Sequence, residues 1–158
     1  MKRIFLCLLL IFPLCACSHG EVSESLPTQF QATVTTSYLG ESFTGDVSSM
    51  PSGEFSVVMK SPSALDGLTV HINADGCRVT KNGIELNYPT DQLGEICPFV
   101  TLYEAVEASR HIVPTVRKNE SDSVLEYDDG ETKYKFTVDR ETEQITKIQA
   151  NKIVYEMR

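Results

Sequence analysis

The sequence predicts a mainly β domain, in which a curved antiparallel half-barrel sheet is wrapped around one mid-chain helix. Two observations predict this fold. Apolar and polar residues alternate along most of the chain from residue 29 onward, and such alternation is typical of half-buried antiparallel strands. The period changes to that of a helix once, over 98–109. A helix on the apolar face of a curved sheet buries both apolar surfaces.

The first expected strands are separated by turn residues. Phe30, Ala32 and Val34 alternate with polar neighbours in the first strand. Lys81-Asn82-Gly83 is a strong hairpin signal, because Asn-Gly suits the tight turns that join antiparallel strands. The predicted strands of this half cover 29–38, 41–49, 54–60, 68–73, 78–80 and 84–88.

The expected helix places Phe99, Leu102, Tyr103 and Val106 at helical spacing, and Pro98 suits its first turn. Strands resume over 123–127 and 133–138, joined by the turn Asp128-Asp-Gly130. The range 144–157 is predicted as one long last strand. Its apolar positions shift parity, so we expect a bulge or bend within it. The total is roughly nine or ten strands.

The N-terminus has the pattern of a secretory signal over residues 1–16. Lys2 and Arg3 precede an apolar run from Ile4 to Leu14. That run is shorter than the roughly 20 apolar residues that a membrane-spanning helix needs.

Leu14-Cys15-Ala16-Cys17 resembles the lipobox of bacterial lipoproteins, with an apolar residue three before the modified cysteine and a small residue one before it. Cys17 fits this pattern, whereas Cys15 would follow the bulky Leu14. The resemblance implies acyl chains on Cys17, which would anchor the chain on the extracytoplasmic side of the plasma membrane, or of the outer membrane in a Gram-negative cell. The alternative is an ordinary signal that is cut near Ala16 or Gly20.

A polar tether is predicted over 17–28, starting at the lipidated cysteine, and one domain of 130 residues over 29–158. The whole chain carries a net charge of −8; without Lys2 and Arg3 it has 12 basic against 22 acidic residues, a net charge of −10. This charge argues against a nucleic-acid partner, which requires clustered basic residues. The negative charge would also be repelled by an anionic membrane, so we expect membrane attachment to depend on the acyl chains on Cys17.

Cys77 and Cys97 are the two cysteines beyond the predicted lipidation residue. Outside the cytoplasm they are candidates for a disulfide, which would close a loop of about 20 residues and stabilise the fold by about 3 kcal/mol. Two buried free thiols are the alternative.

The sequence shows little that resembles catalytic chemistry. It contains no GxSxG, HExxH, CxxC or Gly-rich phosphate loop, and we expect no enzyme activity, cofactor or metal. His71 is expected on the polar face of its strand, and His111 follows the helix end. Asp128, Asp129 and Glu131 do not have the spacing of an EF-hand and are expected to be turn residues.

The candidate binding residues are the apolar side chains of the expected concave face and of the helix. They form either a closed core, which the pattern alone favours, or an apolar cleft for an acyl chain or apolar peptide. They are Phe43, Phe55, Val57, Met59, Leu68, Val70, Ile72, Phe99, Leu102 and Val106.

Several short motifs resemble the outer-membrane lipoprotein carrier superfamily (LolA/LolB-like). They are QFQATV, FTGDV, the run PSGEFSVVMKSPSALDGLTVHINADG from Pro51 to Gly76, and FTVDRETEQITKIQ with Asp139 and Thr142. The resemblance implies an unclosed antiparallel barrel that binds hydrophobic acyl chains.

The first functional hypothesis is therefore a lipid-anchored protein of the cell envelope that binds a hydrophobic ligand, such as an acyl chain or a lipoprotein, without catalysis. The alternative is a protein-interaction or sensor lipoprotein with a filled core and an unknown protein partner. An enzyme is the least favoured hypothesis; it would need a cleft that brings His71 or His111 beside carboxylates.

Overall fold

The computed structural model describes Leu26, residues 29–89 and residues 97–158. The leader predicted over 1–16 and the lipidation predicted at Cys17 lie outside the described residues. Of the tether predicted over 17–28, the structure describes Leu26, whose side chain is buried in the core. The elements of the described ranges are β1 (Phe30–Tyr38), β2 (Glu41–Ser49), β3 (Phe55–Ser61), the 3-10 helix η1 (Ser63–Leu65), β4 (Thr69–Asn73), β5 (Gly76–Lys81), β6 (Ile84–Tyr88), α2 (Pro98–His111), β7 (Thr115–Lys118), β8 (Asp122–Asp128), β9 (Lys133–Asp139), β10 (Ile145–Ala150) and β11 (Ile153–Met157).

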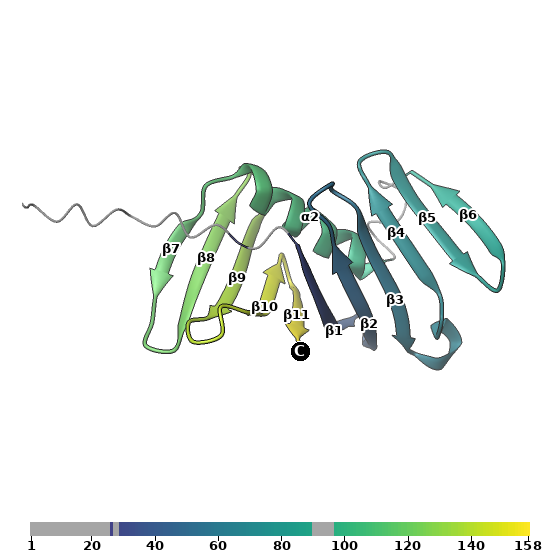
Figure 1. The fold of residues 1–158 in the computed structure, drawn as a ribbon, viewed down its shortest axis with the longest axis horizontal. Helices are drawn as coiled ribbons and strands as arrows, with labels where there is room; N and C mark the ends of the chain where they lie inside the picture. Colours follow the sequence, from purple (N-terminus) through teal and green to yellow (C-terminus); the bar gives the residue numbers. More distant parts are fainter. Residues whose placement is uncertain (1–25, 27–28, 90–96) are drawn as a thin grey trace, which may run out of the picture.

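The strands of the described ranges form one antiparallel sheet of eleven strands, in the order β6-β5-β4-β3-β2-β1-β11-β10-β9-β8-β7. Two meanders meet where the first strand pairs with the last, so that Val34 lies opposite Met157. The sheet is open, with β6 and β7 at opposite ends, and α2 lies against its middle (Figure 1). This architecture confirms the predicted fold class of a mainly β, curved antiparallel sheet around one helix.

The face of the sheet that packs against α2 is called the inner face here, and the opposite one the outer face. Inner-face residues of both meanders meet α2 in one apolar cluster. Val57 and Ile72 come from one meander and Leu125 and Phe136 from the other, each at most 2% exposed. The helix therefore stabilises the two meanders as one core.

The helix is more deeply buried than its predicted apolar stripe requires. Phe99, Leu102 and Val106 are buried as expected. Val100 and Ala105 lie outside the stripe and are fully buried as well. A helix enclosed on most of its sides is typical of a core element rather than of an exposed lid.

Arg110 holds the C-terminal end of α2 against the turn between β2 and β3. Its Nη1 donates to the carbonyl of Pro51 at 3.1 Å, and its Nη2 donates to the carbonyl of Met50 at 2.7 Å and to Ser49 Oγ at 3.0 Å. Its Nε lies 2.8 Å from Glu107 Oε1. A cation is favoured by the helix dipole at this end of a helix, and the charge-assisted hydrogen bonds of Arg110 add to that effect.

The expected hairpin at Lys81-Asn82-Gly83 is confirmed. Asn82 and Gly83 have φ values of 51° and 80°, the left-handed region that a two-residue type I′ turn requires at both positions. The hairpin aligns β5 with β6, with Lys81 opposite Ile84.

The prediction of one long strand over 144–157 was wrong. Two strands occupy this range, β10 and β11, and a turn with Asn151 at φ 54° separates them. Buried apolar residues occupy even positions in β10, such as Ile148, and odd positions in β11, such as Tyr155, and this change comes mainly from the turn. A register shift between Ile145 and Lys147 is also present. Strand β7 was not predicted, because its residues Thr115–Lys118 are all exposed and show no alternation of burial.

Candidate functional site: the apolar inner face

The ten candidate binding residues all belong to the apolar cluster or pack against it. Phe43 and Leu68 are partly exposed. The other eight are at most 3% exposed: Phe55, Val57, Met59, Val70, Ile72, Phe99, Leu102 and Val106. In the structure these eight side chains pack against one another as a closed core. Their role in binding a ligand stays a prediction.

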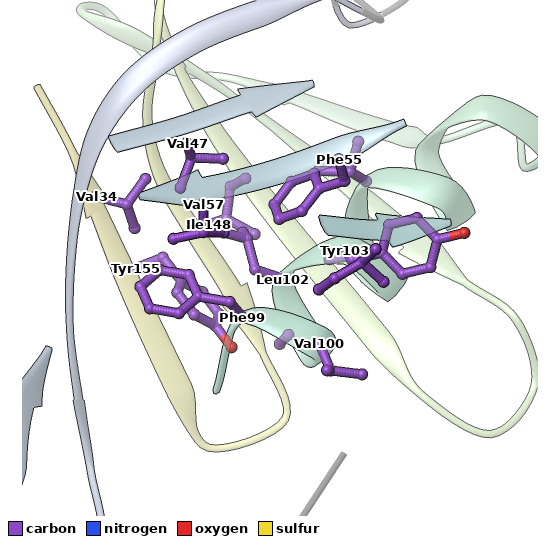
Figure 2. Packing of buried hydrophobic residues seen from close by; sticks show 14 of the residues in the cluster. Val34, Val47, Phe55, Val57, Phe99, Val100, Leu102, Tyr103, Ile148 and Tyr155 are labelled. Carbon is purple, nitrogen blue, oxygen red and sulfur yellow. The ribbon is translucent and has the colours of Figure 1, made fainter. Parts of the chain in front are cut away.

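Close contacts seat the helix on the sheet (Figure 2). The rings of Phe55 and Tyr103 meet edge to face, with centroids 5.9 Å apart. Tyr155 comes from β11, and its hydroxyl donates to the carbonyl of Pro98 at 2.6 Å. Burial raises the pKa of Tyr155, so the hydroxyl keeps its proton for this bond.

The inner face continues beyond the closed core, onto β5 and β6. Val70 pairs with Val79, and Val79 pairs with Leu86 on the next strand. Because paired residues share a face, Leu86 lies on the inner face, and Ile84 and Tyr88 lie there with it. Leu86 is 49% exposed and Ile84 is 66% exposed.

We call Val79, Ile84, Leu86 and Tyr88 the β5–β6 apolar strip. The sequence prediction did not include these residues among the candidate binding residues. The signal that could have found them is the alternation Ile-Glu-Leu-Asn-Tyr over 84–88, with apolar residues at every second position. What the alternation cannot show is that two of these side chains are left exposed.

His71 lies on the outer face, as predicted, and its side chain is exposed. It lines a surface hollow of about 460 Å³ together with Asp75, Arg78 and Asn87, among other residues. The described residues show no hydrogen bond or ion pair between His71 and Asp75. His111 is largely exposed at the end of α2, and its Nε2 lies 3.8 Å from Glu107 Oε2.

The acidic loop between β8 and β9 is built as a turn. Asp129 Oδ1 accepts hydrogen bonds from the backbone N–H groups of Glu131 and Thr132, and Asp128 Oδ1 accepts one from Gly130. These bonds lower the pKa of Asp129, and an ion pair with Lys133 lowers that of Asp128. Among the described residues, no group of three or more His, Cys, Asp or Glu is arranged to hold a metal ion.

Cys77 and Cys97 are free thiols in the structure. Cys77 lies on the inner face of β5 and is buried, whereas Cys97 caps the start of α2 and is partly buried. Burial, and secondarily the neighbouring Cys97, raises the pKa of Cys77 to about 11, and burial also raises the pKa of Cys97. Both thiols are therefore protonated at neutral pH. A disulfide between them stays a prediction.

No protein-family model and no curated protein matches the chain. Among solved structures it is similar to an uncharacterized conserved protein from Thermus thermophilus, with a TM-score of 0.47, 12% identity and coverage of 86% of this chain and 79% of the other. It is also similar to a LolA superfamily protein from Nitrosomonas europaea, with a TM-score of 0.39, 13% identity and coverage of 79% and 65%. No family is assigned by these matches. In the part of the chain that the structure describes, we find no helix of sufficient length and apolarity to cross a bilayer.

Proposed function

We propose that this chain is a lipid-anchored protein of the cell envelope that binds a hydrophobic ligand without catalysis. The observation that carries the proposal is the β5–β6 apolar strip. Leu86 and Ile84 extend the apolar inner face into solvent, where contiguous apolar surface is typical of a binding site. The expected ligand is an acyl chain, either free or as part of a lipoprotein.

The strip is favoured over the space between α2 and the sheet. A ligand between α2 and β3 would have to displace Phe55 and Leu102, which are at most 2% exposed. Displacing such side chains breaks close-packed contacts, whereas a chain laid on Leu86 and Ile84 covers surface that is already exposed. Leu68 and Phe43 are partly exposed as well, and both pack against the core.

A fluorescent fatty acid tests ligand binding. The full-length chain is used as its Cys17→Ser variant, so that its own acyl chains cannot compete. We expect saturable binding that weakens about thirtyfold when Leu86 and Ile84 are both replaced by Asp, because each side chain contributes on the order of 1 kcal/mol of apolar contact, about 2 kcal/mol together.

Val58→Asp is the matched control, since Val58 is 40% exposed but lies on the outer face. Its binding should equal that of the parent. Absence of saturable binding by the parent, or an equal loss in the Val58 variant, would refute the proposed site.

The anchor has a separate test. Labelled palmitate should be attached to the natural chain, which has Cys17, and not to the Cys17→Ser variant. The Cys17→Ser variant should also be absent from the membrane fraction. This expectation is supported by the lipobox pattern Leu14-Cys15-Ala16-Cys17. Equal labelling of both chains, or labelling of neither, would favour the ordinary secretory signal.

A second candidate function is a protein-interaction or sensor lipoprotein without a small ligand. The closed packing of eight candidate binding residues around α2 favours it. Suppose that the Cys17→Ser chain has the circular dichroism spectrum of a folded protein but shows no saturable fatty-acid binding. That result would favour this second function.

A further inference from the structure

Strand β6 is an open edge of the sheet. It pairs with β5 on one side, and no described residue pairs with its other side. Its residues Ile84, Glu85, Leu86 and Asn87 are all exposed. An edge strand offers unpaired backbone N–H and C=O groups to any strand of matching pattern.

The opposite edge, β7, carries features that discourage such pairing. Arg117 and Lys118 are exposed on it, and Pro114 directly precedes it. Basic side chains and proline are the usual protection of an edge strand. Strand β6 has no lysine or arginine, and Pro89 follows only after its last residue. Along its length β6 exposes Leu86 and Ile84 instead.

We propose that β6 pairs with β6 of a second copy of this chain, antiparallel and about a two-fold axis at Leu86. The sequence of β6 is self-complementary in this register. On the inner face Ile84 meets Tyr88 of the second copy, and the two Leu86 side chains meet each other. On the outer face Glu85 meets Asn87 of the second copy. Aliphatic–aromatic and aliphatic pairs of this kind stabilise paired strands.

Charge on the outer face supports this register. Arg78 of β5 lies opposite Asn87 in the same copy. In the dimer Asn87 lies opposite Glu85 of the second copy, so Arg78 and that Glu85 are two strand spacings apart, about 10 Å between backbones. Both are exposed and long enough for their charged ends to approach, and this happens twice because of the two-fold symmetry.

Neighbouring registers are less favourable. A shift of the pairing by two residues toward the β5–β6 turn places Glu85 directly opposite Glu85 of the second copy, and like charges in that position destabilise a strand pair. A shift by one residue places polar residues opposite Leu86 and Tyr88. A shift toward the other end brings in Pro89, which has no N–H to donate.

A second copy is favoured as the occupant because a two-fold pair closes on itself. Each edge finds its complement in the same residues, and no further edge is left at that end of either sheet. The inner-face strips of the two copies would then join into one apolar surface.

Disulfide trapping in intact cells tests the pairing with the full chain. In the Leu86→Cys variant the two introduced thiols face each other across the axis. Dipyridyl disulfide oxidises them to one disulfide and is itself reduced to two pyridinethiones. We expect a covalent dimer of twice the chain mass, and none from the parent, which keeps its natural cysteines.

Two matched variants control for exposure. Val58→Cys is on the outer face, and Val116→Cys is on the other edge strand; these valines are 40% and 37% exposed. Neither variant should form the dimer. Equal dimer from all three variants, no dimer from Leu86→Cys, or a product that joins it to a different protein would overturn the proposal.

Charge exchange gives a second readout. When Glu85→Arg is added to the Leu86→Cys variant, the yield of trapped dimer should fall at least fivefold, because the new arginine side chain approaches Arg78 of the second copy. Adding Arg78→Glu should restore the yield. An unchanged yield in Glu85→Arg would refute the register. Glu85→Arg leaves the apolar strip in place, so fatty-acid binding by this variant separates a failure of the dimer from a failure of the proposed ligand site.

Discussion

Gly45 of β2 lies directly beneath the helix, and replacing it with alanine tests how tightly α2 is seated. An added Cβ would lie 2.8 Å from Val57 Cγ1, 3.1 Å from the carbonyl oxygen of Val58 and 3.6 Å from Phe99 Cζ. The first distance is shorter than carbon atoms tolerate. The second involves backbone, and Val57 is fully buried, so the neighbours have little room to move.

Two effects of opposite sign determine the free energy of unfolding. Overpacking of a close-packed core costs typically 1–3 kcal/mol. Removing a glycine from the interior of a strand returns about 0.5–1 kcal/mol. We therefore expect Gly45→Ala to lower the free energy of unfolding by about 1–2 kcal/mol, which for a domain of this size lowers Tm by about 4–8 °C.

Urea unfolding followed by circular dichroism measures the change, since the chain has no tryptophan. A double-mutant cycle with Val57→Ala supplies the control. In the Val57→Ala background the added methyl group occupies space that the valine has vacated, so most of its cost should disappear. An unchanged or raised stability of Gly45→Ala, or an equal cost in both backgrounds, would show that the contact with Val57 does not limit the packing.

Three further predictions follow from single groups. Tyr155→Phe should lower the free energy of unfolding by about 0.5–1.5 kcal/mol, because it removes the buried hydrogen bond from the Tyr155 hydroxyl to the carbonyl of Pro98; a neutral result in urea unfolding would contradict this. The backbone N–H and the hydroxyl of Thr142 donate hydrogen bonds to Asp139 and lower the pKa of its carboxyl group. These bonds therefore contribute to the free energy of unfolding above the unfolded pKa of about 3.9, and the contribution is lost as pH falls through the lower pKa of the folded state. Asp139→Asn should therefore be less stable than the parent at pH 7, with a difference that shrinks at pH 2, and an equal difference at both pH values would count against this cause. Burial raises the pKa of Cys77 from an ordinary 9.0 to about 11, which lowers its thiolate fraction at pH 8 about 100-fold. Iodoacetamide should therefore alkylate Cys77 far more slowly in the folded chain than in urea, and equal rates would argue against the burial of Cys77.

Local patterns predicted much of the fold. Alternation located β1 to β6 with small errors at their ends, and the helical spacing of Phe99, Leu102 and Val106 located α2. The Asn82-Gly83 turn was predictable because its backbone angles suit those residue types. The turn at Asn151 was missed, since the sequence Asn-Lys carries no strong turn signal, and β7 was missed because an exposed edge strand has no buried face to produce a pattern.

The candidate site was less predictable than the fold. The sequence identified which side chains face inward, and all ten candidate residues do join one cluster. It favoured a closed core but could not decide between a core and a cleft, because both use the same alternation of apolar residues. In the structure Phe55 and Leu102 are closed off because sheet and helix pack against each other. The same arrangement brings Arg110 of α2 into hydrogen-bond contact with the turn between β2 and β3.

By itself, the sequence determined most of the strands, their inner faces and the one helix, since these depend on the period of side chains along a short stretch of backbone. Only the tertiary structure decided which of those faces are covered. Ile72 and Leu86 have the same alternating pattern and lie on the same face, yet they are 1% and 49% exposed. The difference arises because the core around α2 reaches β6 only at Tyr88 and leaves Leu86 uncovered. Where the core lies depends on the pairing of β1 with β11, which joins the two meanders and is a contact between distant parts of the chain.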